Sequence, residues 1–176
     1  MSLGWQVLAA ARARERAVDE ADDAQTLVGA MITAAEAARA HKVQLVYIDA
    51  VKYLHKGSRI GNAASLLGTV LRIRPVVYID HQTGIVEVER AARTRTQGIE
   101  ALVQGFYDRL DLNWPLRVAI LHGNVPEKAQ ELAERIRPEI DPTELLINIT
   151  GPVLGINTGL AALALCGYSD PASSPP

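Results

Sequence analysis

The order of helical and strand-like segments most strongly limits the folds open to this chain. Two segments with apolar residues at helical spacing come first, one over 3–17 and one that runs from a cap at Asp22 or Asp23 to Ala38. Short β-rich runs follow and alternate with further helical segments. These runs cover 43–49, 75–80, 85–90, 116–122, 145–149 and 160–168. The sequence therefore predicts a single α/β domain with a central, largely antiparallel or mixed sheet flanked by helices.

Glycine, proline and asparagine mark the expected connections. The segment 81–84 joins two strand-like runs, and its length and glycine favour a β-hairpin. The turn at 157–159 is expected to join the last two strands as a second hairpin. Asn124 is expected to cap the helix that follows it, and Pro138 and Pro142 are expected to break that helix.

Helical spacing also predicts which side chains share a face. In the first segment these are Leu3, Val7, Leu8 and Ala11. In a helix over 94–110 the inward residues are expected to be Ile99, Leu102, Val103, Phe106 and Leu110. In the helix after Asn124 they are Ala129, Leu132, Ala133 and Ile136.

The composition excludes several classes of protein. A chain of 176 residues can bury a core without disulfides or metal, and a net charge of −2 offers no basic face for nucleic acid. Cys166 is the only cysteine, which excludes an intrachain disulfide and a Cys-based metal cluster, and we expect it to be buried. No run of about 20 apolar residues could span a bilayer and no signal pattern opens the chain, so we expect a cytoplasmic location.

No catalytic or metal-binding signature is present in the sequence. It has no phosphate loop, no Gly-x-Ser-x-Gly elbow and no His-Glu-x-x-His pair, and its four histidines are scattered. His122 follows a predicted strand and precedes Gly123, a place where active-site residues occur, but no partner nucleophile or carboxylate can be assigned to it. We predict no catalytic residues, no metal and no cofactor, and keep a small hydrolase using His122 as an alternative.

Two glycine-containing turns can carry binding chemistry. The first, over 55–61, combines glycine with basic residues, and the second, over 149–159, is punctuated by three glycines. Glycine allows positive φ and close approach to the main chain, so both turns can present backbone N–H groups beside a polar side chain. Such groups hold an oxygen-bearing head group. The alternative is that both are ordinary connections.

Together these turns resemble motifs of the DegV family, bacterial proteins that bind a fatty acid. Segment 53–60 is similar to the family's Leu-Lys-Lys-Gly-Gly-Arg-Ile turn, and segment 71–76 to the Leu-Asn-Ile-Lys-Pro-Ile strand that follows it. Segment 149–159 is similar to the closing Ile-Gly-Pro-Val-Ile-Gly-x-His-x-Gly motif, although Asn157 stands where the family has histidine. The order and spacing of all three segments agree with the family.

The resemblance covers only the C-terminal part of the family's usual length. It implies that residues 1–168 correspond to the C-terminal lipid-binding domain and that the family's first domain, which grips the carboxylate with Ser and Thr, is missing. A shortened chain, a truncated reading frame and a natural half-length protein would all look like this. The Pro- and Ser-rich segment 169–176 is predicted to be a disordered tail.

The resemblance also implies the residues of the site. Arg59 is the first candidate, because a guanidinium fixed in a glycine-rich turn can hold a carboxylate bidentately. Asn157, Thr158 and Gly159 are expected near the same head group, as neutral hydrogen-bonding groups in the far turn. The alternatives are a surface or capping arginine, and an Asx-type turn that satisfies its own backbone.

A basic stretch leads into the helix over 94–110. Arg93 and Arg95 lie in it, and the resemblance implies that they form a docking face for a separate fatty-acid kinase, which phosphorylates the carboxylate of the presented lipid. Solvated surface charge is the alternative. The resulting hypothesis is a non-enzymatic carrier of a long-chain fatty acid. The competing hypothesis is a diverged half-protein that binds no lipid and serves as an interaction or oligomerisation module.

Overall fold

The computed structural model describes residues 2–18, 23–56, 61–66, 73–80 and 83–171. Its elements follow the predicted order of helices and strands. They are α1 (Ser2–Ala17), α2 (Ala24–Ala40), β1 (Lys42–Tyr47), α3 (Lys52–Lys56), the 3-10 helix η1 (Gly61–Leu66), β2 (Arg74–Ile79), β3 (Val86–Ala92), α4 (Arg95–Tyr107), β4 (Leu116–His122), α5 (Pro126–Ile140), β5 (Glu144–Ile149), α6 (Pro152–Thr158) and β6 (Leu163–Ser169).

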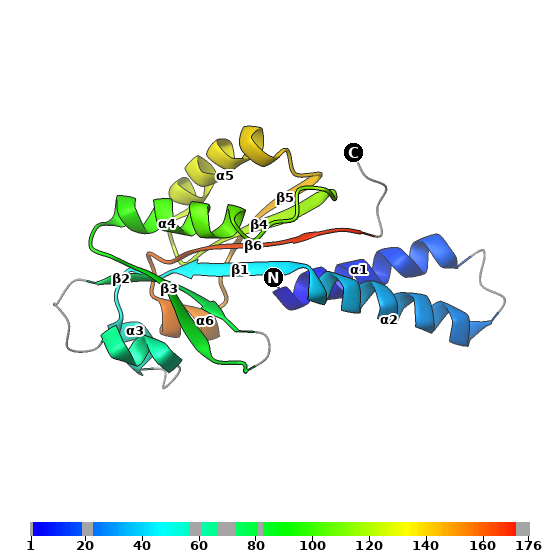
Figure 1. Cartoon of the computed structure of the whole chain (residues 1–176), viewed down its shortest axis with the longest axis horizontal. Coiled ribbons are helices and arrows are strands. Elements are labelled where there is room, and N and C mark those ends of the chain that lie inside the picture. Colours follow the sequence, from blue (N-terminus) through cyan, green and yellow to red (C-terminus); the bar gives the residue numbers. More distant parts are fainter. Residues whose placement is uncertain (1, 19–22, 57–60, 67–72, 81–82, 172–176) are drawn as a thin grey trace.

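Six strands form one mixed sheet in the order β3-β2-β1-β6-β4-β5 (Figure 1). Strands β4 and β5 are parallel, and every other neighbouring pair is antiparallel. The predicted α/β domain with a largely antiparallel sheet is therefore confirmed. The last strand of the chain, β6, lies between β1 and β4, so the first and last strands are neighbours in the middle of the sheet.

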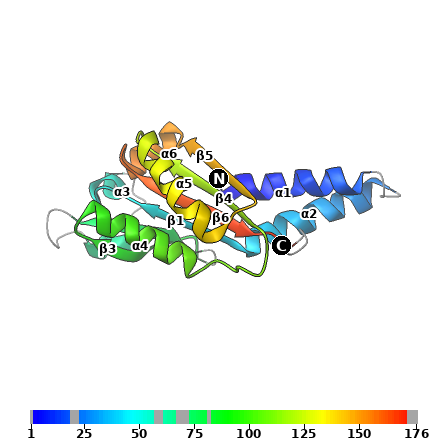
Figure 2. The ribbon, with the colours of Figure 1, turned by 90° about the horizontal axis from the view of Figure 1, so that it is seen from above.

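Helices α4 and α5 cover one face of the sheet and lie side by side over the strands (Figures 1 and 2). Alternate residues of each strand point toward them, such as Val43, Leu45 and Tyr47 in β1 and Leu163 and Leu165 in β6, and all five are buried. The predicted inward residues of α4 and α5 form the other side of this core, with Ile99 and Leu110 only partly buried and Ala101 added. The buried ones are Ala101, Leu102, Val103, Phe106, Ala129, Leu132, Ala133 and Ile136.

The opposite face of the sheet carries two smaller clusters, one toward each end. Helices α1 and α2 pack over Ala119, Cys166 and Tyr168 at one end. Helix α3 and η1 pack over Ile48 and Val77 at the other. Figure 1 shows the hairpin of α1 and α2 extending to one side of the sheet, away from α3 and α6. In the described ranges no helix is long and apolar enough to cross a membrane.

The α1–α2 hairpin is attached to the sheet chiefly through Trp5. Its side chain is 0% exposed, its Nε1 donates a hydrogen bond of 3.1 Å to the carbonyl of Cys166, and its ring lies 5.7 Å from that of Tyr168. The predicted inward face of α1 is therefore partly wrong, because Leu3 and Val7 are 70% and 59% exposed. One large indole and small alanines face the strands, and Leu3 and Val7 lie to the side.

The predicted hairpin between the last two strands is also wrong. Residues 152–158 form helix α6, while β5 pairs in parallel with β4 and β6 pairs with both β1 and β4. Pro152 occupies the start of α6, where its missing N–H costs nothing, and Gly159 ends the helix with φ of 86°. The glycines that suggested a turn therefore delimit a short helix.

Helix α5 differs from its predicted limits at both ends. Val125 precedes the helix without any side-chain cap, while the backbone N–H of Asn124 donates to the carbonyl of Leu160 at 2.6 Å. The helix continues through Pro138 to Ile140. Pro138 lies in the last turn, where it removes one hydrogen bond while the turn before it stays packed on the sheet.

The segment after α3 contains the 3-10 helix η1, which ends at Leu66, and residues 67–72 lie outside the described part of the chain. The C-terminal boundary also shifts. Strand β6 includes Ser169, and Asp170 is buried and paired with Arg117 at 3.0 Å. The ordered region therefore extends past the boundary predicted at residue 168. The tail residues 172–176 lie outside the described ranges.

Candidate functional site

A cavity of about 400 Å³ opens on the face of the sheet opposite α4 and α5. Strands β1 and β2 form its floor, and α3, β3 and α6 form its sides. The lining is almost entirely apolar. It consists of Gln44, Val46, Ile48, Leu54, Val77, Tyr78, Ile79, Val86, Gly151, Val153, Leu154, Asn157 and Thr158.

The apolar floor follows from the alternation of side chains along the strands. In β1, every second residue packs beneath α4, so Gln44, Val46 and Ile48 point to the other face. In β2, Val77 and Ile79 do the same. Helices pack over the two ends of this face, and Ile48 and Val77 are buried beneath α3 and η1. Gln44, Val46 and Ile79 lie between the helices, where they form the open floor of the slot.

Helix α6 supplies the polar end of the cavity. Asn157 and Thr158 lie in its last turn, line the cavity and are only 8% and 5% exposed. The predicted site residue Gly159 caps the helix and is buried, but does not line the cavity. Of the three predicted residues in the far turn, the structure thus brings two into contact with the slot.

Both polar side chains bond to the carbonyls of their own helix. Asn157 Nδ2 donates to the carbonyl of Val153 at 2.8 Å, and Thr158 Oγ1 donates to the carbonyl of Leu154 at 3.0 Å. An amide has a second N–H and a carbonyl oxygen, and a hydroxyl retains its acceptor lone pairs. The two residues are therefore satisfied locally and still have hydrogen-bonding capacity for a ligand.

Arg59 lies outside the described residues, so its approach to Asn157 stays a prediction. Described residues before and after it in the sequence lie at or beside the cavity. Leu54 of α3 lines it, and Gly61 of η1 lies so close to Val86 of the lining that a Cβ at Gly61 would meet the Val86 carbonyl oxygen at 2.5 Å.

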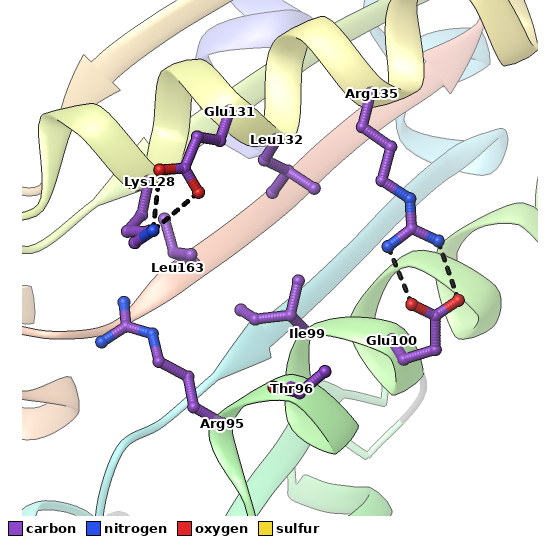
Figure 3. A pocket seen from close by; sticks show the side chains of 9 residues that line it. All are labelled: Arg95, Thr96, Ile99, Glu100, Lys128, Glu131, Leu132, Arg135 and Leu163. Carbon is purple, nitrogen blue, oxygen red and sulfur yellow. Dashed lines mark hydrogen bonds and ion pairs between the residues drawn. The ribbon is translucent and has the colours of Figure 1, made fainter.

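Arg93 and Arg95 lie elsewhere, at the start of α4. Arg93 is exposed, and its carbonyl accepts a hydrogen bond from Arg74 Nη1 at 3.4 Å. Arg95 is half-buried and lines a different pocket, between α4 and α5 (Figure 3). The structure therefore separates these two arginines from Asn157 and Thr158 by the thickness of the sheet.

Sequence reasoning missed most of the apolar lining. Val153 and Leu154 were expected in a turn, and only the helical form of α6 directs them toward β1 and β2. The alternating pattern of Gln44, Val46 and Ile48 was a usable signal, because it left apolar side chains on the face opposite to Val43 and Leu45.

Two reactive side chains, Cys166 and His122, lie on opposite faces of the sheet. Burial raises the pKa of the Cys166 thiol, as expected for a buried cysteine that packs as a small apolar side chain. His122 lies on the α4 and α5 side and is 7% exposed. Among the described residues, no group of three or more His, Cys, Asp or Glu could hold a metal ion.

Comparison with known proteins agrees with this architecture. Residues 1–170 match the family model described as "Uncharacterised protein, DegV family". A DegV domain-containing protein of Streptomyces coelicolor is 32% identical over 168 residues, which cover 94% of this chain and 55% of that protein. The chain thus spans about half the length of this curated relative.

Solved structures share the fold. A DegV family protein from Thermus thermophilus, reported for its fatty-acid binding, superposes with a TM-score of 0.77 at 22% identity, over 96% of this chain and 57% of that one. DegV of Bacillus subtilis, reported as a fatty acid binding protein, gives 0.73 at 21% identity over 96% and 56%. The family match over nearly the whole chain and the shared fold establish that this chain belongs to the DegV family.

Proposed function

We propose that this chain forms one wall of a binding site for a long-chain fatty acid. The observation that carries the proposal is the apolar cavity of about 400 Å³ with Asn157 and Thr158 buried at one side. An elongated apolar ligand with one polar head group matches that distribution of surface. The related proteins of known structure, which are named for fatty-acid binding, support the same choice of ligand.

The magnitude of the hydrophobic effect is sufficient for such a ligand. Burying about 14 methylene groups at about 0.8 kcal/mol each gives on the order of 11 kcal/mol before ordering costs. The cavity is open on one side, since Val153 and Ile79 of its lining are 71% and 45% exposed, so part of a bound acyl chain would stay in contact with water. We propose that the remaining cover comes from a part of a longer protein that corresponds to the other half of its relatives.

The head group needs donors, because an unpaired buried carboxylate would cancel much of that gain. The second N–H of the Asn157 amide is one donor at the polar side of the slot, and the Arg59 guanidinium is proposed as the charged partner. Asn157 carries no charge near neutral pH, so the ionic part of the contact depends on Arg59.

The protein would then act as a carrier rather than a catalyst. We propose that it presents its lipid in the cytoplasm to a separate fatty-acid kinase, and that Arg93 and Arg95 mark the docking face. The exposure of Arg93 suits an electrostatic contact at a surface. Reversal of both charges would weaken docking of the kinase while the affinity for lipid stayed unchanged.

Two substitutions in α6 test the lipid site. Leu154 lines the cavity, whereas Ile156 is 70% exposed and does not. With a fluorescent fatty acid as ligand, Leu154→Asp should weaken binding by at least about tenfold, because a carboxylate would be buried beside the acyl chain. Ile156→Asp should bind as the parent does. Equal affinities for the two variants would refute the assignment, as would the absence of fatty acid from organic extracts of both this chain and the longer protein proposed above.

A second function is favoured by exposed apolar side chains near α6. Val153, Ile156 and Leu160 are 71%, 70% and 69% exposed, a density that suits an interaction or oligomerisation module. This alternative predicts self-association in light scattering with no lipid in the extract. Lipid bound at stoichiometric level by a monomer would exclude it.

A further inference from the structure

A second pocket lies on the other face of the sheet, between α4 and α5. Its volume is about 340 Å³, and apolar side chains including Leu163 form its base (Figure 3). Five charged residues surround it: Arg95 and Glu100 from α4, and Lys128, Glu131 and Arg135 from α5. The sheet separates this pocket from Asn157 and Thr158, so it is not part of the lipid site.

Four of the five charges are paired with each other. Arg135 donates two hydrogen bonds of 2.8 Å to the carboxylate of Glu100, and Lys128 Nζ lies 2.7 Å from both carboxylate oxygens of Glu131. Arg95 is the remaining cation, and among the described residues it has no ion pair. Its Nη2 is shut off from solvent and has no hydrogen-bond partner in the described part of the chain. A buried guanidinium nitrogen without an acceptor is costly. Because Nη2 does not face the cavity, an anion in the pocket would accept from it after the Arg95 guanidinium turns toward the cavity.

Lys128 can join Arg95 in holding that anion. Figure 3 shows the Arg95 side chain extending toward the Lys128 side of the pocket, away from the Arg135–Glu100 pair. The Lys128–Glu131 pair is exposed and spans three residues of one helix, an arrangement that contributes little and exchanges readily. The ammonium group can therefore turn to an incoming ligand.

The start of α5 adds backbone donors at the same end. Lys128 lies in the first turn of α5, and Val125 before the helix provides no side-chain cap. Pro126 has no N–H and the Ala129 N–H donates to Val125, so the N–H groups of Glu127 and Lys128 are the donors left in that turn. They and the helix dipole favour a negative charge, part of which Glu127 already supplies. The start of α4 differs, because Thr94 and Gln97 form a capping box there.

A buried histidine lies next to the pocket without lining it. His122 is 7% exposed, and its Nδ1 has no hydrogen-bond partner among the described residues. It ends β4 in register with Leu163, which lines the pocket. Its position alternates in step with Val118 and Ile120, whose side chains pack beneath α4 and α5, so His122 points to the same side.

We propose that this pocket binds a phosphate group, either free or as the monoester of a small metabolite. The Arg95 guanidinium would hold the phosphate oxygens bidentately, with Lys128 and the first N–H groups of α5 as further donors. The pocket is roomy enough for an organic substituent, which the apolar base formed with Leu163 can accommodate. The proposal does not depend on the lipid site.

Calorimetric titration of the purified chain with inorganic phosphate and with adenosine monophosphate tests the proposal. We expect at least one of them to bind at millimolar concentration or below, with NMR shift changes at His122 and Leu163. Tighter binding of the nucleotide would identify a phosphate monoester as the ligand, and binding of inorganic phosphate alone would identify the free ion. No binding of either up to about 10 mM would overturn the proposal.

Matched variants locate the binding. Arg95→Gln should weaken affinity by about tenfold or more, and Lys128→Gln by a smaller factor. Arg137→Gln removes an exposed cation from the last turn of α5, outside the pocket, and should leave affinity unchanged. Fatty-acid binding by the Arg95 variant serves as the check of its fold. An Arg95 variant that retains the parent's fold and affinity would refute the assignment.

Discussion

Gly159, at the end of α6, lies against the aromatic ring of Tyr53 in α3. A Cβ added at Gly159 would sit 2.6 Å from Cε2 of that ring, and φ of 86° at this residue lies in the left-handed region. The contact holds α3, which leads into segment 55–61, against α6, which forms most of segment 149–159. Two segments far apart in the sequence are thereby fixed side by side next to the apolar cavity.

Gly159→Ala should consequently destabilise the protein. The left-handed conformation alone costs about 1–3 kcal/mol for a residue with a side chain, and the Tyr53 ring must also move. Gly155→Ala is the matched control, because nothing lies within 4 Å of a Cβ there and alanine favours a helix by up to about 1 kcal/mol. Urea unfolding measures both. A Gly159 variant as stable as the Gly155 variant would contradict the proposed contact.

The alternation of short apolar runs was enough to predict the strands, since each is bounded by glycine, proline or a change of period. Strand β4 matches its prediction at both ends, because Pro115 and Gly123 bracket it. The pairing of β5 with β4 was not predictable, because the glycines around α6 indicate a turn and the register depends on distant contacts.

The site was predictable only as far as its motif reached. The motif points to Asn157 and Thr158, which the structure places at the end of helix α6 and in the cavity lining, and their contact with a head group stays a prediction. Their hydrogen bonds to the carbonyls of Val153 and Leu154 require the helical form of α6, which the glycines obscured. The role of Arg59 remains a prediction.

Trp5 should be the most sensitive residue of the α1–α2 hairpin. Trp5→Ala removes a fully buried ring and the hydrogen bond to the Cys166 carbonyl, so we expect a loss of about 3–5 kcal/mol or detachment of the hairpin. Leu3→Ala on the same helix should cost little, since Leu3 is 70% exposed. Denaturant unfolding and hydrogen exchange of α1 and α2 distinguish these results. Equal losses in the two variants would show that the hairpin is not anchored through Trp5.

Tyr47 should contribute to alkaline unfolding. Burial and then the hydrogen bond from its hydroxyl to Asp49 Oδ1, of 3.0 Å, raise the pKa of Tyr47 from 10.0 to about 12. Because the pKa of Tyr47 is higher in the folded state, its protonated hydroxyl stabilises the fold below pH 10, and this contribution to the unfolding free energy is lost as the pH rises toward 12. Tyr47→Phe should therefore show a shallower decline in unfolding free energy over that interval. Burial also raises the pKa of Tyr107 and Tyr168, so a decline should remain. An unchanged slope in the variant would contradict this role.

Asn157→His should make lipid binding depend on pH. The family motif that this segment resembles has histidine at this position, and an imidazolium at the polar side of the cavity would attract the carboxylate, whereas an amide cannot change charge. Affinity of the variant for a fatty acid should rise by up to about tenfold as the pH falls through about 6.5, while the parent changes much less over the same range. Thr158→Val, which removes the neighbouring hydroxyl and adds no titratable group, should follow the parent. Binding measured by fluorescence across this pH range tests the pair. Identical pH profiles for Asn157→His and the parent would place the carboxylate away from residue 157 and leave the acyl chain as the only part of the ligand in contact with α6.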